Sequence, residues 1–454
     1  MLRTLIVLGI LAAPIAAQHQ KDDGYRGIWY MNQPSGDQYH YKYSGGMATY
    51  PQQHIPIAWY SAEANKTFFC YGGTAEGKNE LLHLVSYYDH ATGRVPRPVI
   101  LLDKQTSDAH DNPVLALDEE GYIWIFSNAH GTSRPAYIHR GKRPYSVDDF
   151  DLIEETNFSY SEPWLIPGKG FLFLHTLYRD GGRSLFWKTS KDGVRWSEPA
   201  LLARMDQGHY QISWRDGERL GTAFNYHPAP VGLNARTNLY YVQTDDFGQT
   251  WRTASGEPVA TPLTSPDSPA LVRDFASEGE LVYLKDMQFD ARGRPVIVFL
   301  TSRGYQSGPS GDPRVLKTAR WTGAAWEIRP ITETDHNYDY GSLYIEPDGA
   351  WRFIGPTEPG PQAYGAGGEI VMWLSRDEGR SWKKARQLTR GSRYNHTYVR
   401  RPVNAHPDFY AIWADGDAFA PSGSSLYFTN RAGSRVWRLP RKMDGDWAKP
   451  EPVR

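Results

Sequence analysis

Apolar segments in this chain come in pairs, and the same pair recurs seven times. Each copy has a polar or histidine-bearing opening, a strand-length apolar segment, a tight polar turn and a second apolar segment with a polar tail. The openings begin at Tyr50, Ala109, Tyr160, Gly208, Leu284, Tyr338 and His396. The second segments are KTFFCY, YIWIFSN, GFLFLHT, RLGTAFNY, PVIVFLT, WRFIG and FYAIWA. A repeat of roughly fifty to seventy residues in a strand-rich chain is typical of a propeller blade, so we predict an all-β, seven-bladed β-propeller.

Three of the predicted blades carry a further motif, Ser/Thr-x-Asp-x-Gly-x-x-Trp with small departures. It occurs at Thr189–Trp196, Thr244–Trp251 and Ser375–Trp382. The motif resembles the Asp-box of the bacterial neuraminidase (BNR) repeat. In that hairpin, Asp and Ser/Thr satisfy turn amides, Gly takes the unusual backbone angle and Trp packs between blades. We therefore expect Asp-box (BNR) hairpins that identify the architecture and carry no chemistry of their own.

The bulk properties fit one domain. The chain has 454 residues, and no Pro/Ser-rich linker or charge block divides it. Propellers of this size form single domains, so we expect one catalytic propeller over residues 18–454, acting as a monomer. The formal net charge is -1, with 50 Lys and Arg against 51 Asp and Glu. This balance gives no electrostatic basis for binding nucleic acid.

The first residues have the pattern of a secretory signal. Arg3 precedes an apolar run from Leu5 to Ala13, and the small residues Ala16 and Ala17 follow. The run is too short to span a bilayer. We predict a signal peptide over residues 1–17 and a secreted or periplasmic protein without a membrane span. Cys70 is the single cysteine, which excludes an internal disulfide, and we expect it to be a small buried residue.

Chemistry is expected where the innermost strands begin and the second strands end, because both places surround one funnel of a propeller. The sharpest pair is His110 and His130, at the two ends of one predicted hairpin. Imidazole and phenol are the usual proton-transfer groups of an enzyme without metal or cofactor motifs. We predict that His110, His130 and Tyr210 are catalytic. The alternative is that they hydrogen-bond across the channel and stiffen it.

The fourth blade repeats this arrangement. His209 precedes Tyr210 at one end of its hairpin, and Tyr226 and His227 stand at the other. We predict that His209, Tyr226 and His227 bind substrate, as does Gln53 at the start of the first blade.

Arginines near the funnel are candidate clamps for an acidic sugar, because guanidinium matches a carboxylate in a bidentate way. Arg236 follows the fourth hairpin and is the first choice; Arg183 follows Tyr178 in the third blade. The sequence has no Cys/His zinc spacing, phosphate-binding glycine loop or nucleophile elbow. We expect that the protein requires no cofactor. A structural calcium ion bound by carboxylates of the channel remains an alternative.

Several segments resemble one group of carbohydrate-active enzymes. They are GYRGIWY, YKYSGGMATYPQQH, ANKTFFCYGG, GHYQ, FNYHP and RTNLYY. Together they are similar to the BNR-repeat propeller proteins, which include ulvan lyases, rhamnose–glucuronate lyases and α-L-rhamnosidases. In ulvan lyases the catalytic residues are two histidines on one blade, a tyrosine and an arginine. The resemblance places the two histidines at His110 and His130 and the tyrosine at Tyr210. Tyr226 and His227 stand where the arginine is expected, and this departure favours the rhamnose–glucuronate branch.

The sequence therefore predicts a polysaccharide lyase that cleaves the bond to C4 of a uronic acid by β-elimination. The expected substrate is an acidic polysaccharide or oligosaccharide with rhamnosyl-glucuronate linkages. Three alternatives remain. One is an ulvan lyase, and one is a non-catalytic glycan-binding propeller. The third is an α-L-rhamnosidase or sialidase-like hydrolase, for which Asp111, Glu162 and Asp286 could supply the two carboxylates.

Overall fold

The computed structural model describes residues 19–47, 54–179 and 182–453. The predicted signal peptide and Gln53 lie outside these ranges. No helix in the described part is long and apolar enough to cross a membrane. The helical elements are three short 3-10 turns, η1 (Ala109–Asp111), η2 (Gly232–Ala235) and η3 (Pro309–Gly311).

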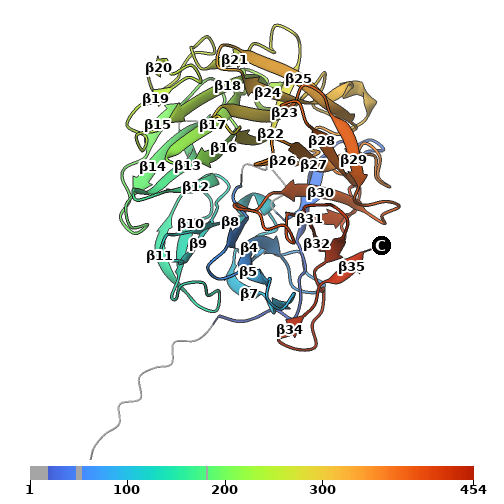
Figure 1. Ribbon diagram of the computed structural model, residues 1–454. Coiled ribbons are helices and arrows are strands. Elements are labelled where there is room, and N and C mark those ends of the chain that lie inside the picture. Colours follow the sequence, from blue (N-terminus) through green and yellow to red (C-terminus); the bar gives the residue numbers. More distant parts are fainter. Residues whose placement is uncertain (1–18, 48–53, 180–181, 454) are drawn as a thin grey trace, which may run out of the picture.

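Figure 1 looks along the axis of a ring of antiparallel sheets. The first blade contains β3 (Ala58–Ser61), β4 (Lys66–Gly73), β5 (Leu82–Asp89) and β7 (Val99–Asp103). The second contains β8 (Pro113–Leu117), β9 (Ile123–Ser127), β10 (Ala136–Gly141) and β11 (Phe150–Thr156). The third contains β12 (Ser159–Ile166), β13 (Gly170–Arg179), β14 (Gly182–Ser190) and β15 (Ala200–Ala203).

The fourth blade has two extra short strands. It contains β16 (Gln211–Asp216), β17 (Arg219–Tyr226), β18 (Thr237–Thr244), β19 (Trp251–Arg252), β20 (Pro258–Val259) and β21 (Leu271–Arg273). The fifth contains β22 (Leu281–Phe289), β23 (Pro295–Ser302), β24 (Arg314–Trp321) and β25 (Trp326–Thr334). The sixth contains β26 (Ser342–Ile345), β27 (Trp351–Glu358), β28 (Glu369–Ser375) and β29 (Lys383–Gln387). The seventh contains β30 (Asn395–Arg400), β31 (Ala411–Gly416), β32 (Leu426–Thr429), β33 (Val436–Arg438) and β35 (Glu451–Val453).

These seven sheets confirm the predicted seven-bladed propeller, and each predicted pair of apolar segments forms the first two strands of one blade. The second blade shows why the sequence folds this way locally. Strands β8 and β9 pair from Pro113 with Ser127 to Leu117 with Ile123. In the turn between them, the Asp118 carboxylate accepts a hydrogen bond from the Tyr122 amide at 2.7 Å, and Gly121 has φ +85°. The hairpin therefore brings the residues before β8 and after β9 to one face of the ring.

The Asp-box hairpins lie at the opposite face, after the third strand of blades three, four and six. In the first of them, Asp192 accepts from the amides of Val194 and Arg195 at 2.9 and 2.8 Å, and Gly193 has φ +71°. Trp251 is 2% exposed, whereas Trp196 and Trp382 are half-buried. Cys70 is fully buried on β4, as expected.

The ring is closed by the N-terminal segment, which lies between the first and last blades. Gly27 forms bridges with Gly73 of the first blade and Ser424 of the seventh. Its amide donates to the Ser424 carbonyl at 3.1 Å, and the Ile28 amide donates to the Gly72 carbonyl at 3.0 Å. A second link is the pairing of β6 (Val95–Pro96) with β34 (Trp447–Ala448).

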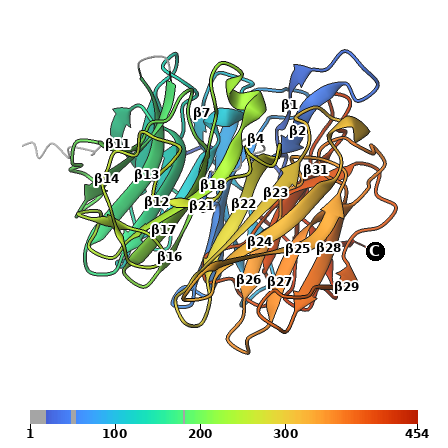
Figure 2. The same cartoon turned by 90° about the horizontal axis from the view of Figure 1, so that it is seen from above.

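A separate hairpin of β1 (Trp29–Pro34) and β2 (Tyr41–Gly46) follows this segment. Figure 2 shows it at the upper face of the ring. It brings Tyr30 to 5.5 Å from the His110 ring and Tyr43 to 5.1 Å from the Tyr338 ring, measured between ring centroids. The hairpin therefore forms part of the wall around the candidate site.

Candidate active site

His110 and His130 share one carboxylate, that of Asp108. Asp108 caps the 3-10 turn η1, and its oxygens accept hydrogen bonds from Nδ1 of His110 at 2.5 Å and Nδ1 of His130 at 2.7 Å. The two rings are stacked, with centroids 3.9 Å apart and an angle of 12° between their planes. Because both Nδ1 atoms face Asp108, both Nε2 atoms point away from it. The structure thus brings together the two histidines that the hairpin pattern paired.

Burial disfavours the charged form of Asp108, but the hydrogen bonds from His110 and His130 outweigh it and hold the pKa of the carboxyl well below its usual range. Burial also lowers the pKa of His110, although Asp108 opposes this shift. Arg134 fixes the carboxylate from the other side. Its Nη2 lies 3.1 Å from Asp108 Oδ2, and its Nε donates to Asp111 Oδ2 at 2.8 Å. Asp108 is therefore an ionised, oriented acceptor.

The two histidines differ in access. The side chain of His110 is 3% exposed, and that of His130 is 33% exposed. A substrate entering the funnel can reach His130, whereas His110 lies behind it.

Three tyrosines continue the site into the third and fourth blades. Tyr178 at the end of β13 lies 5.9 Å from His130 between ring centroids, and its hydroxyl is 2.9 Å from that of Tyr160. Tyr160 packs edge-on against Tyr210 at 5.5 Å. Burial raises the pKa of Tyr178 to about 12, although Arg183 opposes this shift. Tyr178 is half-buried, but Tyr160 and Tyr210 are 1% and 2% exposed.

Two arginines and a buried lysine lie near these tyrosines. Arg183 donates from Nη1 to the Tyr210 hydroxyl at 2.6 Å, and Arg236 donates from Nη2 to the Tyr338 hydroxyl at 3.0 Å. Lys42 on β2 is buried, and its Nζ donates to Asn234 Oδ1 at 2.5 Å. Burial lowers the pKa of Lys42 to about 6, with further repulsion from Arg236 and Arg183. Lys42 is therefore mostly neutral at neutral pH, and the two guanidinium groups supply the positive charge that suits an anionic ligand.

The remaining predicted residues of the fourth blade lie deeper. His209 is fully buried; its Nε2 accepts from the Met205 amide at 2.9 Å and its Nδ1 donates to the Asn225 carbonyl at 2.8 Å. This arrangement favours a structural role over the predicted substrate contact. His227 is also fully buried and packs edge-on against Tyr210 at 4.9 Å, while Tyr226 is 8% exposed. His227 therefore contacts the site through Tyr210, whereas Tyr226 packs edge-on against Tyr240 at 6.2 Å.

Sequence reasoning missed Asp108, Arg134 and Lys42. Asp108 stands two residues before His110, and an acidic residue there is the usual cap of a short turn, so this signal was present. Lys42 carried no such signal, because its position depends on how the β1–β2 hairpin folds over the ring.

Residues 57–334 match the model of the BNR repeat-containing family. The chain belongs to this family. Among curated relatives, an ulvan lyase from Nonlabens ulvanivorans is 25% identical over 356 residues, which cover 69% of this chain and 72% of the relative. An ulvan lyase of Pseudoalteromonas sp. (strain PLSV) is 24% identical over 408 residues, covering 77% of this chain and 78% of the relative.

Solved structures show the same fold as this BNR repeat-containing protein. A PL25 polysaccharide lyase, also an ulvan lyase, superposes with a TM-score of 0.69 at 16% identity, covering 91% of this chain and 96% of that chain. The polysaccharide lyase Uly1 superposes with a TM-score of 0.61 at 10% identity, covering 91% and 99%. The curated relatives and these structures span most of the propeller.

Proposed function

We propose that the protein is a polysaccharide lyase that cleaves the bond to C4 of a uronic acid by β-elimination. The observation that carries the proposal is the pair of histidines held on Asp108, with Tyr178 on one side and two arginines, Arg183 and Arg236, near it. The names of the curated relatives support the same reaction class.

The reaction needs a base, an acid and a partner for the carboxylate. The base removes the proton from C5 of the uronate, and the electron pair passes toward the carboxylate as an enolate. The pair then forms the C4=C5 double bond while the bond between C4 and its oxygen breaks, and the acid protonates that oxygen. A preorganised cation or donor at the enolate is worth on the order of 3–4 kcal/mol, by analogy with oxyanion sites.

His130 is the group best placed to act as the base. Its Nδ1–H donates to Asp108, so in the neutral ring Nε2 carries a free lone pair on the exposed side. Tyr178 is the complementary acid, because a pKa of about 12 keeps its hydroxyl protonated at neutral pH. His110 and Asp108 position His130.

Arg183, which is half-buried, is the expected direct partner of the uronate carboxylate, and Arg236, which is 1% exposed, adds positive charge beside it. The guanidinium carbons of Arg183 and Arg236 lie 4.9 and 5.1 Å from the centroid of the Tyr210 ring, so both groups occupy one region. With 2% exposure, Tyr210 is better suited to orienting Arg183 than to the proton transfer predicted from its sequence position.

A two-carboxylate hydrolase is disfavoured by the places of its three candidate residues. Glu162 is fully buried, and burial raises its pKa to about 8. Asp111 is fully buried between Arg134 and Lys104. Asp286 accepts from the Met287 and Leu343 amides at 2.9 and 2.7 Å. All three are held by protein donors, away from a substrate.

The proposed substrate is a glucuronate–rhamnose polymer. In this proposal the enzyme is secreted or periplasmic and meets the polymer outside the cytoplasm. One PL25 structure is bound to -[GlcA(1-4)Rha3S]-, and both curated relatives are ulvan lyases. The ligand of that PL25 structure and the two ulvan lyase relatives support a rhamnose–glucuronate glycan as substrate. Ulvan is therefore the first substrate to test.

The test incubates the purified protein with ulvan and with gum-arabic-type arabinogalactan, and follows ultraviolet absorbance alongside released sugar. A lyase produces absorbance from a conjugated unsaturated uronate. Ulvan with its carboxyl groups reduced to alcohols is the matched substrate control and should not react. Release of sugar without absorbance would replace the lyase by a hydrolase, and binding without either product would replace it by a glycan-binding protein.

A further inference from the structure

A second cluster of histidine and aspartate lies between the first and last blades. His90 directly follows β5, and His406 and Asp408 lie in the loop between β30 and β31. The His90 amide donates to the Asn65 carbonyl in the β3–β4 turn at 3.2 Å, which places the cluster at the face opposite His110 and His130. The cluster is therefore separate from the candidate active site.

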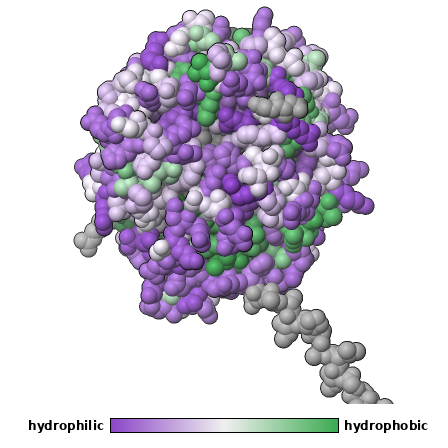
Figure 3. Space-filling view, turned by 180° about the vertical axis from the view of Figure 1, so that it is seen from behind, coloured by the Kyte–Doolittle hydropathy of each residue, from purple (hydrophilic) through white to green (hydrophobic). Residues whose placement is uncertain are grey.

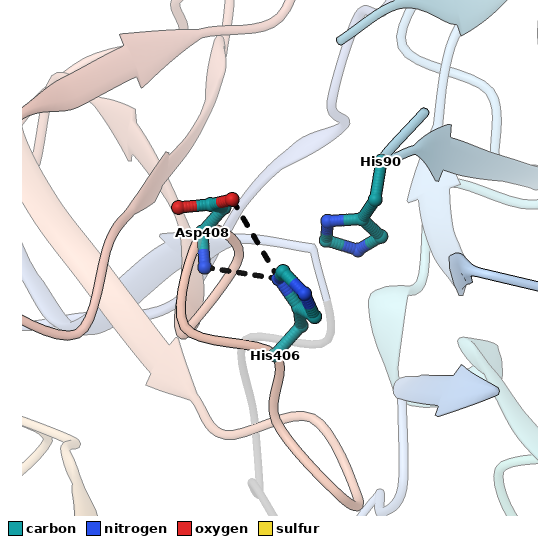
Figure 4. Close-up of side chains that lie close together, drawn as sticks. All are labelled: His90, His406 and Asp408. Atoms are coloured by element: carbon teal, nitrogen blue, oxygen red, sulfur yellow. Dashed lines mark hydrogen bonds and ion pairs between the residues drawn. The ribbon is translucent and has the colours of Figure 1, made fainter. Parts of the chain in front are cut away.

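The three side chains converge. Figure 4 shows the His90 ring facing His406, with Asp408 on the far side of His406. The two ring centroids are 3.8 Å apart, and each of the three residues offers a nitrogen or oxygen atom within 4.8 Å of the others. The Tyr60 ring lies 5.2 Å from His90 and 4.8 Å from His406 between centroids, so it packs against both imidazoles.

His90 is prepared to donate a lone pair. Its Nε2 lies 2.8 Å from the Thr67 hydroxyl, and its Nδ1 is buried without a hydrogen-bond partner among the described residues. When Nε2–H donates to Thr67, the lone pair on Nδ1 is free; metal-binding histidines are commonly oriented by such a second contact.

His406 and Asp408 are held on a fixed turn. The turn is closed by the Phe409 amide, which donates to the His406 carbonyl at 3.0 Å, and the Phe409 side chain is fully buried. Nδ1 of His406 accepts from the Asp408 amide at 3.1 Å and lies 3.9 Å from Asp408 Oδ2. The Asp408 side chain is 68% exposed, so its carboxylate can turn toward an ion. Coordination would replace the hydrogen bond that His406 accepts from this amide.

We propose that His90, His406 and Asp408 form a binding site for a divalent transition-metal ion such as Zn²⁺, which clips the first blade to the last. Two imidazole nitrogens and one carboxylate match the ligands of Zn²⁺ and leave a position for water, whereas Ca²⁺ and Mg²⁺ prefer oxygen ligands. An ion that binds the folded ring and not the unfolded chain stabilises the ring closure.

The test must separate this cluster from Asp108, His110 and His130, which also lie close enough to hold an ion. His130→Ala, stripped with EDTA and desalted, therefore serves as the background for equilibrium dialysis against ZnCl₂ and for thermal unfolding. We expect about one Zn²⁺ per chain and a rise in Tm of at least about 2 °C at saturation. Adding His406→Ala should abolish both effects.

Two further variants guard against misfolding and nonspecific binding. Asp408→Asn removes only an exposed carboxylate, so the metal-free Tm should stay unchanged while Zn²⁺ binding weakens by at least about tenfold. His40→Ala removes an exposed histidine outside the cluster and should leave binding intact. Equal Zn²⁺ binding by His130→Ala with and without His406→Ala, or no binding by His130→Ala, would overturn the proposal.

Discussion

His110 and His130 lie with their rings 3.9 Å apart and donate to the two oxygens of the same carboxylate, that of Asp108. One negative charge thus serves two imidazoles, so a proton gained by either ring is felt by the other. Groups that act as such a unit show non-additive effects when removed. We therefore expect the two histidines to act as one unit in proton transfer, with His130 exposed and His110 covered.

His130→Ala should lower turnover by at least about a hundredfold, the lower end for a positioned acid–base group. His110→Ala and Asp108→Asn should also lower it, because each loosens the orientation of His130. Combining His110→Ala with His130→Ala should cost little more than His130→Ala alone. Steady-state kinetics and circular dichroism of the variants check this. Normal activity per folded molecule, with a lower Tm, would mean that the pair only stiffens the funnel.

Tyr178→Phe should lower kcat by at least about a hundredfold while leaving KM within about threefold, because it removes the proposed acid and keeps the ring. Tyr210→Phe is the matched comparison. It removes the hydroxyl that receives the Arg183 hydrogen bond, so its main effect should be on KM. The opposite pattern in the two variants would return the proton-transfer role to Tyr210.

Arg236→Ala should raise KM and lower kcat together, because the carboxylate is bound in the ground state and gains charge as the proton leaves. Arg236→Lys should recover only part of the loss, since an ammonium cannot reproduce the guanidinium geometry that reaches both the Leu233 carbonyl and the Tyr338 hydroxyl. Arg183→Ala should behave in the same direction. Arg303→Ala is the control: this side chain is 51% exposed and pairs with Glu280. Unchanged kinetics for Arg236→Ala would remove it from the site.

Trp251→Ala should lower the free energy of unfolding by about 3–5 kcal/mol, the range for a large buried aromatic side chain. Trp196→Ala and Trp382→Ala should cost less, because these rings are half-buried. Urea unfolding gives the three values, and kcat per folded molecule should stay constant. An active-site defect at unchanged stability would contradict the structural role of the Asp-boxes.

The wild-type protein should lose stability as the pH falls below about 6.5. Burial lowers the pKa of His209 to about 4 in the folded protein, so below 6.5 the unfolded chain binds a proton that the folded chain does not. Between about pH 7.5 and about pH 5, this one residue costs roughly 2 kcal/mol. His209→Gln keeps an acceptor for the Met205 amide without titrating, and urea unfolding should show a flatter pH dependence. An identical slope in both proteins would show that His209 does not contribute.

Much of this architecture was predictable because strands and hairpins are determined by residues that are close together in the sequence. The apolar segments Pro113–Leu117 and Ile123–Ser127, with the polar turn between them, predict from the sequence alone that His110 lies beside His130. Depth within the funnel was not predictable in the same way. His227 and His130 both follow the second strand of their hairpins, yet His227 is fully buried and the His130 side chain is one-third exposed. That difference is set by loops and by the β1–β2 hairpin, which come from distant parts of the chain.

Ring closure through Gly27 also has a consequence for biosynthesis. This residue bridges Gly73, made early, and Ser424, made near the end. A chain emerging from its N-terminus can build successive blades, but it cannot seat Gly27 on both neighbours until the last blade has been synthesised. Until then the partial ring is an open arc whose two end blades each have one uncovered face, and chaperone protection would matter most at that stage.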